Sequence, residues 1–590
     1  MTELYLITAD FQKTQIPHGS RRLHLNPLTY RNILEIAGEK YNSEEIASPF
    51  GVNTNEFKRA QKLASKIYQV SLKSLVLKLN QQHGSSYGKR FWETLIGPWL
   101  EVFVNAITHR ALHLKKIDSS YDEPIVHITF LDSDIPTNIV TLTTIDFIKS
   151  TNDPVWNNII LAELIDILNL RNIRNREIVP SRFSGSKQQG TQYLSWKKKW
   201  YGFFSRFFNK FLLSNGNFLV FESYLSLSEE MLLNLRLGNL LLPHVFDDRF
   251  LYLGPLKNIS RFKDTSSLIS MIFSQLPVCY RENFKLLERT VGSEFDYSRI
   301  GLCYTVGGAR NSEYFKYIAA RVTDRGGKYV VGQHGNAYGV HTETSRGFEM
   351  NSPDFFFSWG WTSERAASQV LPVGKFTRAI QKGKTSSKQS GKGKHILIVV
   401  RGHGDRYDLR DKTYDYFFQH EFLKKIIKCL ITGCDKIVLT IRGHNNRYNT
   451  ILTDDLLLFS DQFGSRVRYD NGARRFCDIA KDFDLVVFTY DSTGFLECLE
   501  VQQPALMVFQ DFDGRIFPEV LPDYEALTSV GLWLDTGEIR KLVEIVCSID
   551  SWWSSDSVKK VVGNHASKYC KLLANRSRVL SQSLVTLVQG

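Results

Sequence analysis

Asp484-Leu-Val-Val-Phe-Thr-Tyr-Asp-Ser-Thr-Gly-Phe-Leu-Glu-Cys-Leu-Glu500 is the stretch that decides the fold of this 590-residue chain. Its first part is continuously apolar and predicts a buried β-strand. Residues 495–500 predict a helix, and the polar residues 491–494 form the loop between the two. Buried strands that alternate with helices indicate a parallel sheet covered on both faces.

The same order of strand, polar loop and helix occurs twice more in the C-terminal part. The strand predicted at 395–400 ends in Arg401-Gly-His-Gly404, and the strand predicted at 436–441 ends in Arg442-Gly-His444. A helix is expected between them, near 414–431. Ligands of parallel sheets bind at the carboxyl ends of the strands, where all three polar loops fall.

A similar pattern precedes residue 380. Strands are predicted at 300–306, 328–332 and 354–359, and the second of these ends in Gln333-His-Gly335. A helix is predicted at 313–322. Further strands are expected at 3–8, 125–131 and 217–222. The N-terminal part therefore also contains an α/β sheet.

The boundary between the two parts is residues 381–394, which consist of Gly, Ser, Thr, Lys and Gln. Such a composition is typical of a flexible linker or an exposed loop. We expect an N-terminal domain over 1–380, with a helical insertion at about 151–250, and a C-terminal domain over 395–590. Two α/β domains with polar loops on facing strand ends would form a cleft enzyme.

Composition narrows the class of protein. The apolar fraction of 43% is that of a globular chain, and 74 Lys and Arg against 61 Asp and Glu give a net charge of +13. A basic chain favours an anionic partner. The basic residues are spread along the chain and form no RNA-binding signature, so no nucleic-acid partner is expected.

The 8 cysteines include no CxxC pair, which argues against a zinc or thioredoxin-like site and fits a reduced cytosol. The N-terminus lacks the features of a signal peptide, and no apolar run approaches the length of a membrane span. We therefore expect a cytoplasmic protein.

One segment could contact a membrane. Residues 196–211 place aromatic side chains at spacings of three and four, flanked by basic ones. A basic aromatic helix suits the surface of an anionic bilayer, and an ordinary core helix with a basic edge explains the pattern equally well. The candidate membrane contacts are Trp196, Lys198, Trp200, Phe204 and Phe207.

Candidate catalytic residues lie at predicted strand ends. His334 stands between Gln333 and Gly335, and a histidine at a strand end beside glycine can act as a base or donate to phosphate. Glu222 and Asp10 each end a predicted strand. Taken alone, either carboxylate suits a structural role better than a catalytic one.

Other residues suit a phosphate. Arg401 and Arg442 offer guanidinium forks, and His444 adds a directional donor. Ser and Thr at a helix start cap the helix, and the same amides and dipole bind phosphate. Glu497, one turn into that helix, suits ribose hydroxyls or solvent. The loop itself contributes Asp491, Ser492, Thr493 and Gly494 to the candidate donor contacts, which also include Gln333 and Gly335 beside His334.

This set of motifs resembles the CDP-glycerol glycerophosphotransferases and the capsule-type Kdo transferases. It is more similar still to a family of transferases from O-antigen and other bacterial surface-carbohydrate loci. The similarity rests on an opening strand at 4–8, the tract His83–Leu100, the QHG-x-x-YG motif at 333–339 and the T-x-x-STGFLE stretch at 489–497.

The resemblance implies a GT-B fold of two Rossmann-like domains and a cytoplasmic glycosyltransferase at the inner face of the membrane. Arg442, His444, Ser492 and Thr493 would hold the donor phosphate, and His334 would lie at the reaction centre. The expected partners are a nucleotide sugar and a lipid-linked or polysaccharide acceptor, with no metal and no other cofactor.

The donor is left open between two classes. The chain has Arg-Gly-His-Asn where the teichoic acid enzymes show Arg-x-His-Pro, and Ser-Thr where they often show Ser-Ser. These departures favour a CMP-activated sugar acid such as Kdo. The alternatives are a glycerophosphate or polyol-phosphate transferase and a non-catalytic anion- or membrane-binding protein.

Overall fold

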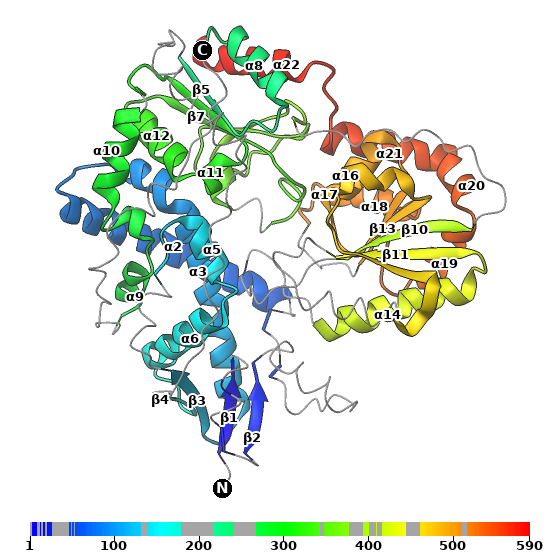
Figure 1. Cartoon of the computed structure of the whole chain (residues 1–590), viewed down its shortest axis with the longest axis horizontal. Helices are drawn as coiled ribbons and strands as arrows, with labels where there is room; N and C mark the ends of the chain where they lie inside the picture. The colour runs from blue at the N-terminus through cyan, green and yellow to red at the C-terminus, as the bar shows by residue number, and fades with distance from the viewer. Residues whose placement is uncertain are drawn as a thin grey trace.

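The fold is built on three parallel sheets, whose central strands are mainly apolar (Figure 1). The structure is a computed structural model. It describes residues 3–8, 12, 16–17, 20–25, 47–48, 50–51, 54–130, 140–178, 217–239, 267–294, 296–342, 347–376, 393–400, 409, 416–443, 461–509 and 516–589.

The first two sheets belong to the N-terminal part. The four-stranded sheet has the order β2 (Arg21–His24), β1 (Leu4–Ile7), β3 (Ile125–Phe130), β4 (Ile173–Ile178). The five-stranded sheet has the order β5 (Phe218–Phe221), β6 (Leu302–Thr305), β7 (Lys328–Gly332), β8 (Phe355–Phe357), β9 (Gln369–Leu371).

The third sheet forms the C-terminal domain. It has the order β12 (Val467–Asp470), β11 (Ile437–Arg442), β10 (Lys394–Val399), β13 (Leu485–Phe488), β14 (Ala505–Val508), β15 (Trp533–Leu534). Numbered along the chain, the strands have the order 3-2-1-4-5-6, which is the Rossmann arrangement. The strand order reverses between β10 and β13, although these two strands are parallel. The predicted α/β GT-B fold with two Rossmann-like domains is confirmed.

Helices connect the strands and cover the sheets. In the N-terminal part they are α2 (Thr54–His83), α3 (Lys89–Ser120), α5 (Thr144–Ser150), α6 (Pro154–Leu168), α8 (Leu227–Arg236), α9 (Leu268–Ser274), α10 (Phe284–Glu294), α11 (Gly308–Asn311), α12 (Glu313–Asp324) and α13 (Phe348–Asn351). In the C-terminal part they are α14 (Tyr416–Gly433), α16 (Phe476–Ile479), α17 (Thr493–Val501), α18 (Leu521–Ser529), α19 (Ile539–Cys547), α20 (Ile549–Ser554), α21 (Asp556–Tyr569) and α22 (Arg576–Gln589).

Local chemistry sets several of the helix ends. Asp153 caps α6 by accepting from the amides of Val155 and Trp156, and Pro154 takes the first helical position, where no amide is needed. At the start of α8, Ser226 and Glu229 form a reciprocal capping box. These ends are therefore specified by short-range sequence.

Alternating side chains bury both faces of the C-terminal sheet. Along β10, Ile396 and Ile398 pack with residues of α14 and α19, whereas Leu397 and Val399 join a cluster that includes residues of α17 and α21. This second cluster continues into the N-terminal part, so the two domains share one buried apolar core. The shared core fixes the strand ends of the two sheets near each other.

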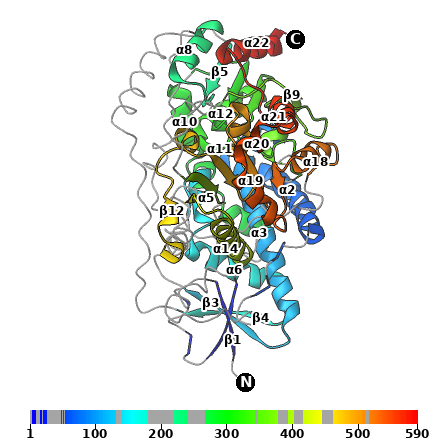
Figure 2. The same cartoon turned by 90° about the vertical axis from the view of Figure 1, so that its right-hand side faces the viewer.

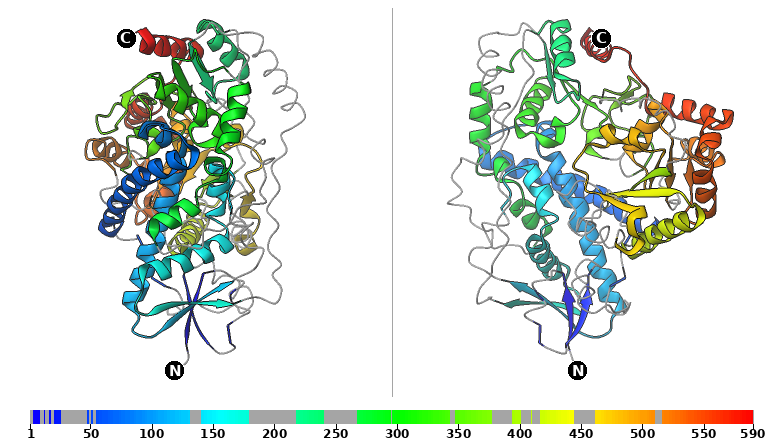
Figure 3. Two further views of the ribbon diagram at one scale, coloured as in Figure 1. Left: turned by 90° about the vertical axis from the view of Figure 1, so that its left-hand side faces the viewer. Right: turned by 45° about the vertical axis from the view of Figure 1, so that its right-hand side comes forward.

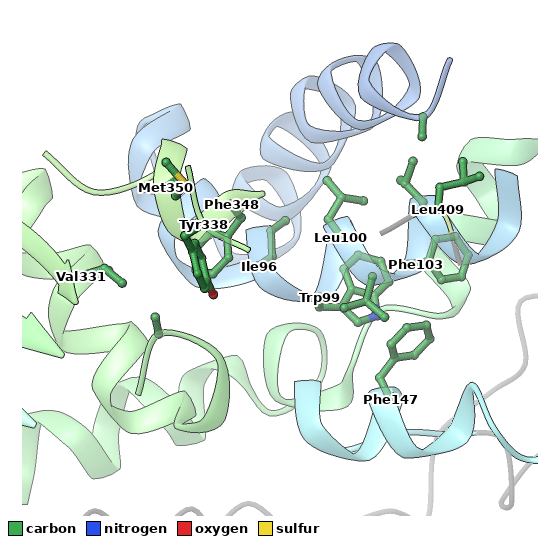
Figure 4. Close-up of a cluster of buried hydrophobic side chains, with 14 of the residues drawn as sticks. Ile96, Trp99, Leu100, Phe103, Phe147, Val331, Tyr338, Phe348, Met350 and Leu409 are labelled. Atoms are coloured by element: carbon green, nitrogen blue, oxygen red, sulfur yellow. The ribbon is translucent and has the colours of Figure 1, made fainter. Parts of the chain in front are cut away.

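Helix α3 is the central buried helix of the N-terminal part. Its Trp92 and Trp99 are fully buried, and Figure 4 shows Trp99 and Phe103 of α3 beside Phe147 of α5. One turn earlier on the same helix, Ile96 lies near Phe348. The predicted tract His83–Leu100 thus spans the end of α2 and the first part of α3, and it supports the loops around Tyr338 and α13.

The strands predicted from the sequence are confirmed, but they divide differently from the expectation. The strands predicted at 3–8 and 125–131 form a separate four-stranded sheet, which Figure 2 shows near the N-terminus, away from β5. The segment expected as a helical insertion at about 151–250 contains α6, β4, β5 and α8 among its described residues. Residues 381–392 of the predicted linker lie outside the described part.

The chain returns to the N-terminal domain at its end. Helix α22 packs against α8, and its Leu580 and Leu584 are buried with Phe218 and Leu302 of the five-stranded sheet (Figures 1 and 3). The apolar face of α22 would otherwise remain exposed to water. The sequence pattern assigns residues 395–590 to the C-terminal domain and does not predict that α22 packs on the N-terminal domain.

Replacing Leu584 by Ala tests this packing. The buried side chain leaves a cavity, and the free energy of unfolding should fall by about 2–5 kcal/mol. Differential scanning calorimetry should show a lower melting temperature. Leu572→Ala is the matched control because Leu572 is 58% exposed and should change little. Equal effects of the two substitutions would contradict the burial of α22.

Candidate functional site

Three loops of the five-stranded sheet leave its carboxyl edge side by side. They follow β5, β6 and β7, and they carry Glu222, Arg310 and His334. Because the three strands are neighbours and parallel, their loops meet at one edge. The predicted residues Glu222 and His334 are thus brought to the same edge of one sheet.

His334 belongs to a hydrogen-bonded cluster. Its Nδ1 lies 3.1 Å from the hydroxyl of Tyr338 and 3.7 Å from Oε2 of Glu349. The Tyr338 hydroxyl donates to the same carboxylate. The His334 side chain is 34% exposed, so the ring is held by protein on one side and remains accessible.

Glu349 is a buried carboxylate surrounded by positive charge and donors. Nε of Arg310 lies 3.4 Å from its Oε1, and Nη2 of Arg310 lies 3.9 Å from Oε2 of Glu101 on α3. Burial acts to raise the pKa of Glu349, but Arg310, His334 and the Tyr338 hydrogen bond outweigh it, and the pKa is lowered. Glu349 is therefore ionised at neutral pH.

Glu222 is in the opposite electrostatic situation. Burial raises its pKa, and a hydrogen bond with Asn311 lowers it by less. Its Oε2 has no hydrogen-bond partner among the described residues. A carboxylate with a raised pKa and an unused oxygen is suited to proton transfer.

The backbone around Glu222 is strained. Glu222 and Tyr224 have φ values of 46° and 63°, a region that residues other than glycine seldom adopt. Gly307 faces this turn, and a Cβ there would lie 2.5 Å from Oε2 of Glu222. The packing of the β5 and β6 loops thus holds an unfavourable conformation, which is common at functional sites.

The loop after β13 lies at the reversal point of the C-terminal sheet. Ser492 caps α17 by accepting from the amide of Gly494. A Cβ on Gly494 would come within 2.9 Å of Phe488 and 3.0 Å of Phe476, so glycine permits the close approach of this loop to the sheet. The loop therefore presents the N-terminus of α17 at the edge where Rossmann domains bind phosphate.

The two predicted loops contact each other directly. The amide of Asn336 donates to Oγ1 of Thr493 at 2.9 Å, and the Asn336 side chain donates to Asp491. His341 Nε2 lies 2.6 Å from Oδ2 of Asp491, and Tyr524 donates to that oxygen at 2.7 Å. We call the contacts of Asn336 and His341 with Asp491 and Thr493 the interdomain clasp, and Tyr524 of α18 supports Asp491 from within its own domain.

Other candidate residues are held by protein groups. Gln333 accepts from Trp361 and from the amide of Trp359, and it donates to the carbonyl of Gly335. Its side chain therefore braces the turn that carries His334.

Arg442 and Glu497 are also paired. Arg442 donates to Asp470 and to the carbonyl of Arg474, and its side chain is 9% exposed. Glu497 lies 3.3 Å from the ammonium of buried Lys375. The expectation that these two residues contact the donor stays a prediction.

Several predicted residues fall outside the described part of the chain. They are Asp10, Arg401, His444 and the aromatic segment 196–211. Within the described part, no group of three or more His, Cys, Asp or Glu residues could hold a metal ion. No helix there is long and apolar enough to cross a membrane.

Sequence reasoning missed Arg310 and Glu349. Arg310 had a signal, because Gly307-Gly308 directly follows a buried strand and marks a close approach there. Glu349 had none, since it lies on the short helix α13 before β8 and does not directly follow a strand.

Comparison with known proteins gives one family. The model of a family described as LIC12162 family transferase matches residues 20–584. No curated protein matches the chain.

Solved structures give only distant likenesses. A structure of the wall teichoic acid polymerase TagF is 11% identical, covers 67% of this chain and 99% of its own, and has a TM-score of 0.34. An apo structure of OtsA is 10% identical, covers 52% and 76%, and has a TM-score of 0.32.

The clasp can be tested by Asp491→Ala. The substitution leaves the buried donors of His341 and Tyr524 without their acceptor, which should cost about 2–4 kcal/mol of unfolding free energy. Thermal unfolding should occur at a lower temperature. Asp478→Ala, which breaks an exposed pair with Arg475, is the control and should have a minor effect. A similar melting temperature for both variants would refute the clasp.

Proposed function

The chain belongs to the LIC12162 family of transferases, and from this premise we propose that it is a glycosyltransferase that uses a nucleotide-activated donor. The observation that carries the proposal is the direct contact between the loop of His334 and the loop of Thr493. It would join an edge suited to proton transfer on one sheet to an edge suited to phosphate binding on the other.

In this proposal the donor phosphate lies between the two domains. The N-terminus of α17, with Ser492 and Thr493, would neutralise the phosphate from one side. Arg310 and His334 would approach it from the other. Stabilising the leaving phosphate in this way promotes cleavage of the sugar–phosphate bond, because negative charge develops on it in the transition state.

Glu222 is proposed as the base. The acceptor hydroxyl would attack the anomeric carbon while Oε2 of Glu222 takes its proton, and the nucleotide would leave with the bonding electrons. A raised pKa makes a carboxylate a stronger base, which supports this assignment over Glu349. Glu349 would instead hold His334 and Arg310 in place.

The donor is proposed to be a CMP-activated sugar acid such as Kdo, and the acceptor a surface polysaccharide or its lipid-linked precursor at the inner face of the membrane. The support is the departure of residues 442–445 and 492–493 from the teichoic acid pattern, together with the basic charge of the chain. The competing hypothesis is a CDP-glycerol donor, and the experiment below distinguishes the two.

The donor site is tested first by thermal shift with CMP, CDP, UDP, GDP and ADP, with and without EDTA. A nucleotide that binds only the folded state raises the melting temperature by mass action. We expect a shift with CMP that EDTA does not abolish, and hydrolysis of CMP-Kdo in preference to CDP-glycerol.

Arg310→Gln should reduce the CMP shift, whereas Arg325→Gln should keep it, because Arg310 lies on α11 before α12 and Arg325 lies at the C-terminal end of α12, before β7. Absence of a shift with every nucleotide at saturating concentration would overturn the proposal. A shift with CDP and preferential hydrolysis of CDP-glycerol would instead identify the competing donor.

Glu222→Gln tests the base. The turnover number should fall by about 10²- to 10⁴-fold, with the CMP shift retained. In the wild type the rate should fall as pH drops through the pKa of Glu222, which lies above the ordinary value of 4.5, because the base must be unprotonated. Glu229→Gln, on α8, is the control. Full turnover by Glu222→Gln would exclude this residue as the base.

A further inference from the structure

Two cysteines far apart in the chain face each other on the C-terminal domain. Their sulfur atoms, of Cys434 and Cys547, lie 2.6 Å apart although 113 residues separate them in sequence. Cys434 directly follows α14, and Cys547 is the last residue of α19. These two helices pack against each other on the same face of the sheet.

The surroundings hold the two thiols in this position. Gly433 sits against α19 so closely that a Cβ on it would lie 2.6 Å from Val543. The Cys547 sulfur lies 3.6 Å from the carbonyl of Gly433, and the Cys434 sulfur lies 3.9 Å from the carbonyl of Val543. Joining the sulfurs therefore requires little movement of either helix.

The two thiols differ in access to solvent. Cys434 is buried and Cys547 is exposed. A small oxidant can reach Cys547, and the buried partner is then adjacent to resolve the adduct. This is the arrangement of an exposed thiol with a nearby resolving thiol that redox-sensitive sites use.

We propose that Cys434 and Cys547 form a reversible disulfide by exchange with a small-molecule disulfide of the glutathione type. Disulfides in reducing compartments are rare and serve mainly catalytic or sensing roles. An exposed bridge of this kind is also accessible to reductants, so it can be reopened.

The exchange proceeds in two balanced steps. The Cys547 thiolate attacks one sulfur of the small disulfide, whose S–S bond breaks and releases one small thiolate. Burial raises the pKa of Cys434 to about 12, so this thiol is protonated and reacts second. It passes its proton to the released thiolate and attacks the sulfur of Cys547, expelling the second small thiolate, which takes up from solvent the proton that Cys547 lost when its thiolate formed. The two protein thiols are oxidised and the small disulfide is reduced to two thiols.

The bridge would act at the edge of the sheet opposite the clasp. Cys434 precedes β11, and Lys394 at the start of β10 donates to the carbonyls of Val546 and Cys547 at 2.9 and 2.7 Å. A bond here would tie α14 to α19 where the chain enters the C-terminal domain. It should stabilise this domain by restricting its unfolded state, without altering the strand ends that carry Asp491.

The test uses the full-length protein incubated with oxidised glutathione, trapped with iodoacetamide and digested without reduction. A peptide that joins Cys434 to Cys547 is expected, together with a higher melting temperature that dithiothreitol reverses. Cys434→Ser and Cys547→Ser should abolish both changes. Cys429→Ser, one turn back on α14, should retain them.

Two results would overturn the proposal. One is a protein in which Cys547 remains as the mixed disulfide with glutathione and Cys434 remains a free thiol, which iodoacetamide then alkylates. The other is a bridge between Cys547 residues of two copies, visible as a covalent dimer under non-reducing conditions.

Discussion

The carboxylate of Asp491 is the contact on which the arrangement of the site depends. It stands at the reversal point of the Rossmann sheet and accepts hydrogen bonds from Asn336 and Tyr524, with His341 at 2.6 Å. Two of these partners come from the loop that also carries His334. Removing any one of them would leave a buried polar group with less than its normal hydrogen bonding, which a protein interior tolerates poorly. The same few atoms therefore set both the position of α17 and its distance from the five-stranded sheet.

At the carboxyl edge of the five-stranded sheet, the protonation states of the two carboxylates follow from a balance between burial and pairing with positive charge. Glu222 follows β5 and Glu349 lies on α13 between β7 and β8, yet the pKa values of the two carboxylates shift in opposite directions. Arg310 is the main cause of this difference in pKa. Its positive charge lies against Glu349 and offsets the effect of burial on that carboxylate, whereas Glu222 has no such partner among the groups that shift its pKa. Two carboxylates whose environments separate their pKa values divide the chemistry between them, one holding charge and one moving a proton. The strain at Glu222 and Tyr224 is consistent with that division.

Sequence was informative wherever the signal was local. Strands of continuous apolar residues, the Ser492 cap and the glycine after His334 are specified within a few residues, and each was predicted from them. Pairing across the chain was not predictable in this way. Nothing near Arg442 shows that Asp470 will take its guanidinium, and nothing near Glu349 shows that α13 will be placed beside His334. The packing of α22 on the N-terminal domain was not predicted for the same reason, because an amphipathic helix near the end of a chain fits either domain. Local pattern thus gave the edges of the sheets, and the partners that meet there required the structure.

A second tie between the domains acts on the same helix as the clasp. Buried Lys375, at the end of the N-terminal domain, lies 2.6 Å from Glu500 and 3.3 Å from Glu497, both on α17. Helix α17 is therefore held at its first turn by Asn336 and one to two turns later by Lys375. Separating an ion pair this deeply buried would expose unpaired charge to an apolar environment, at a cost of about 3–5 kcal/mol. If the domains move during turnover, α17 must move with the N-terminal domain or this pair must break. The phosphate-binding helix then keeps its place relative to His334 throughout any motion that leaves Lys375 paired.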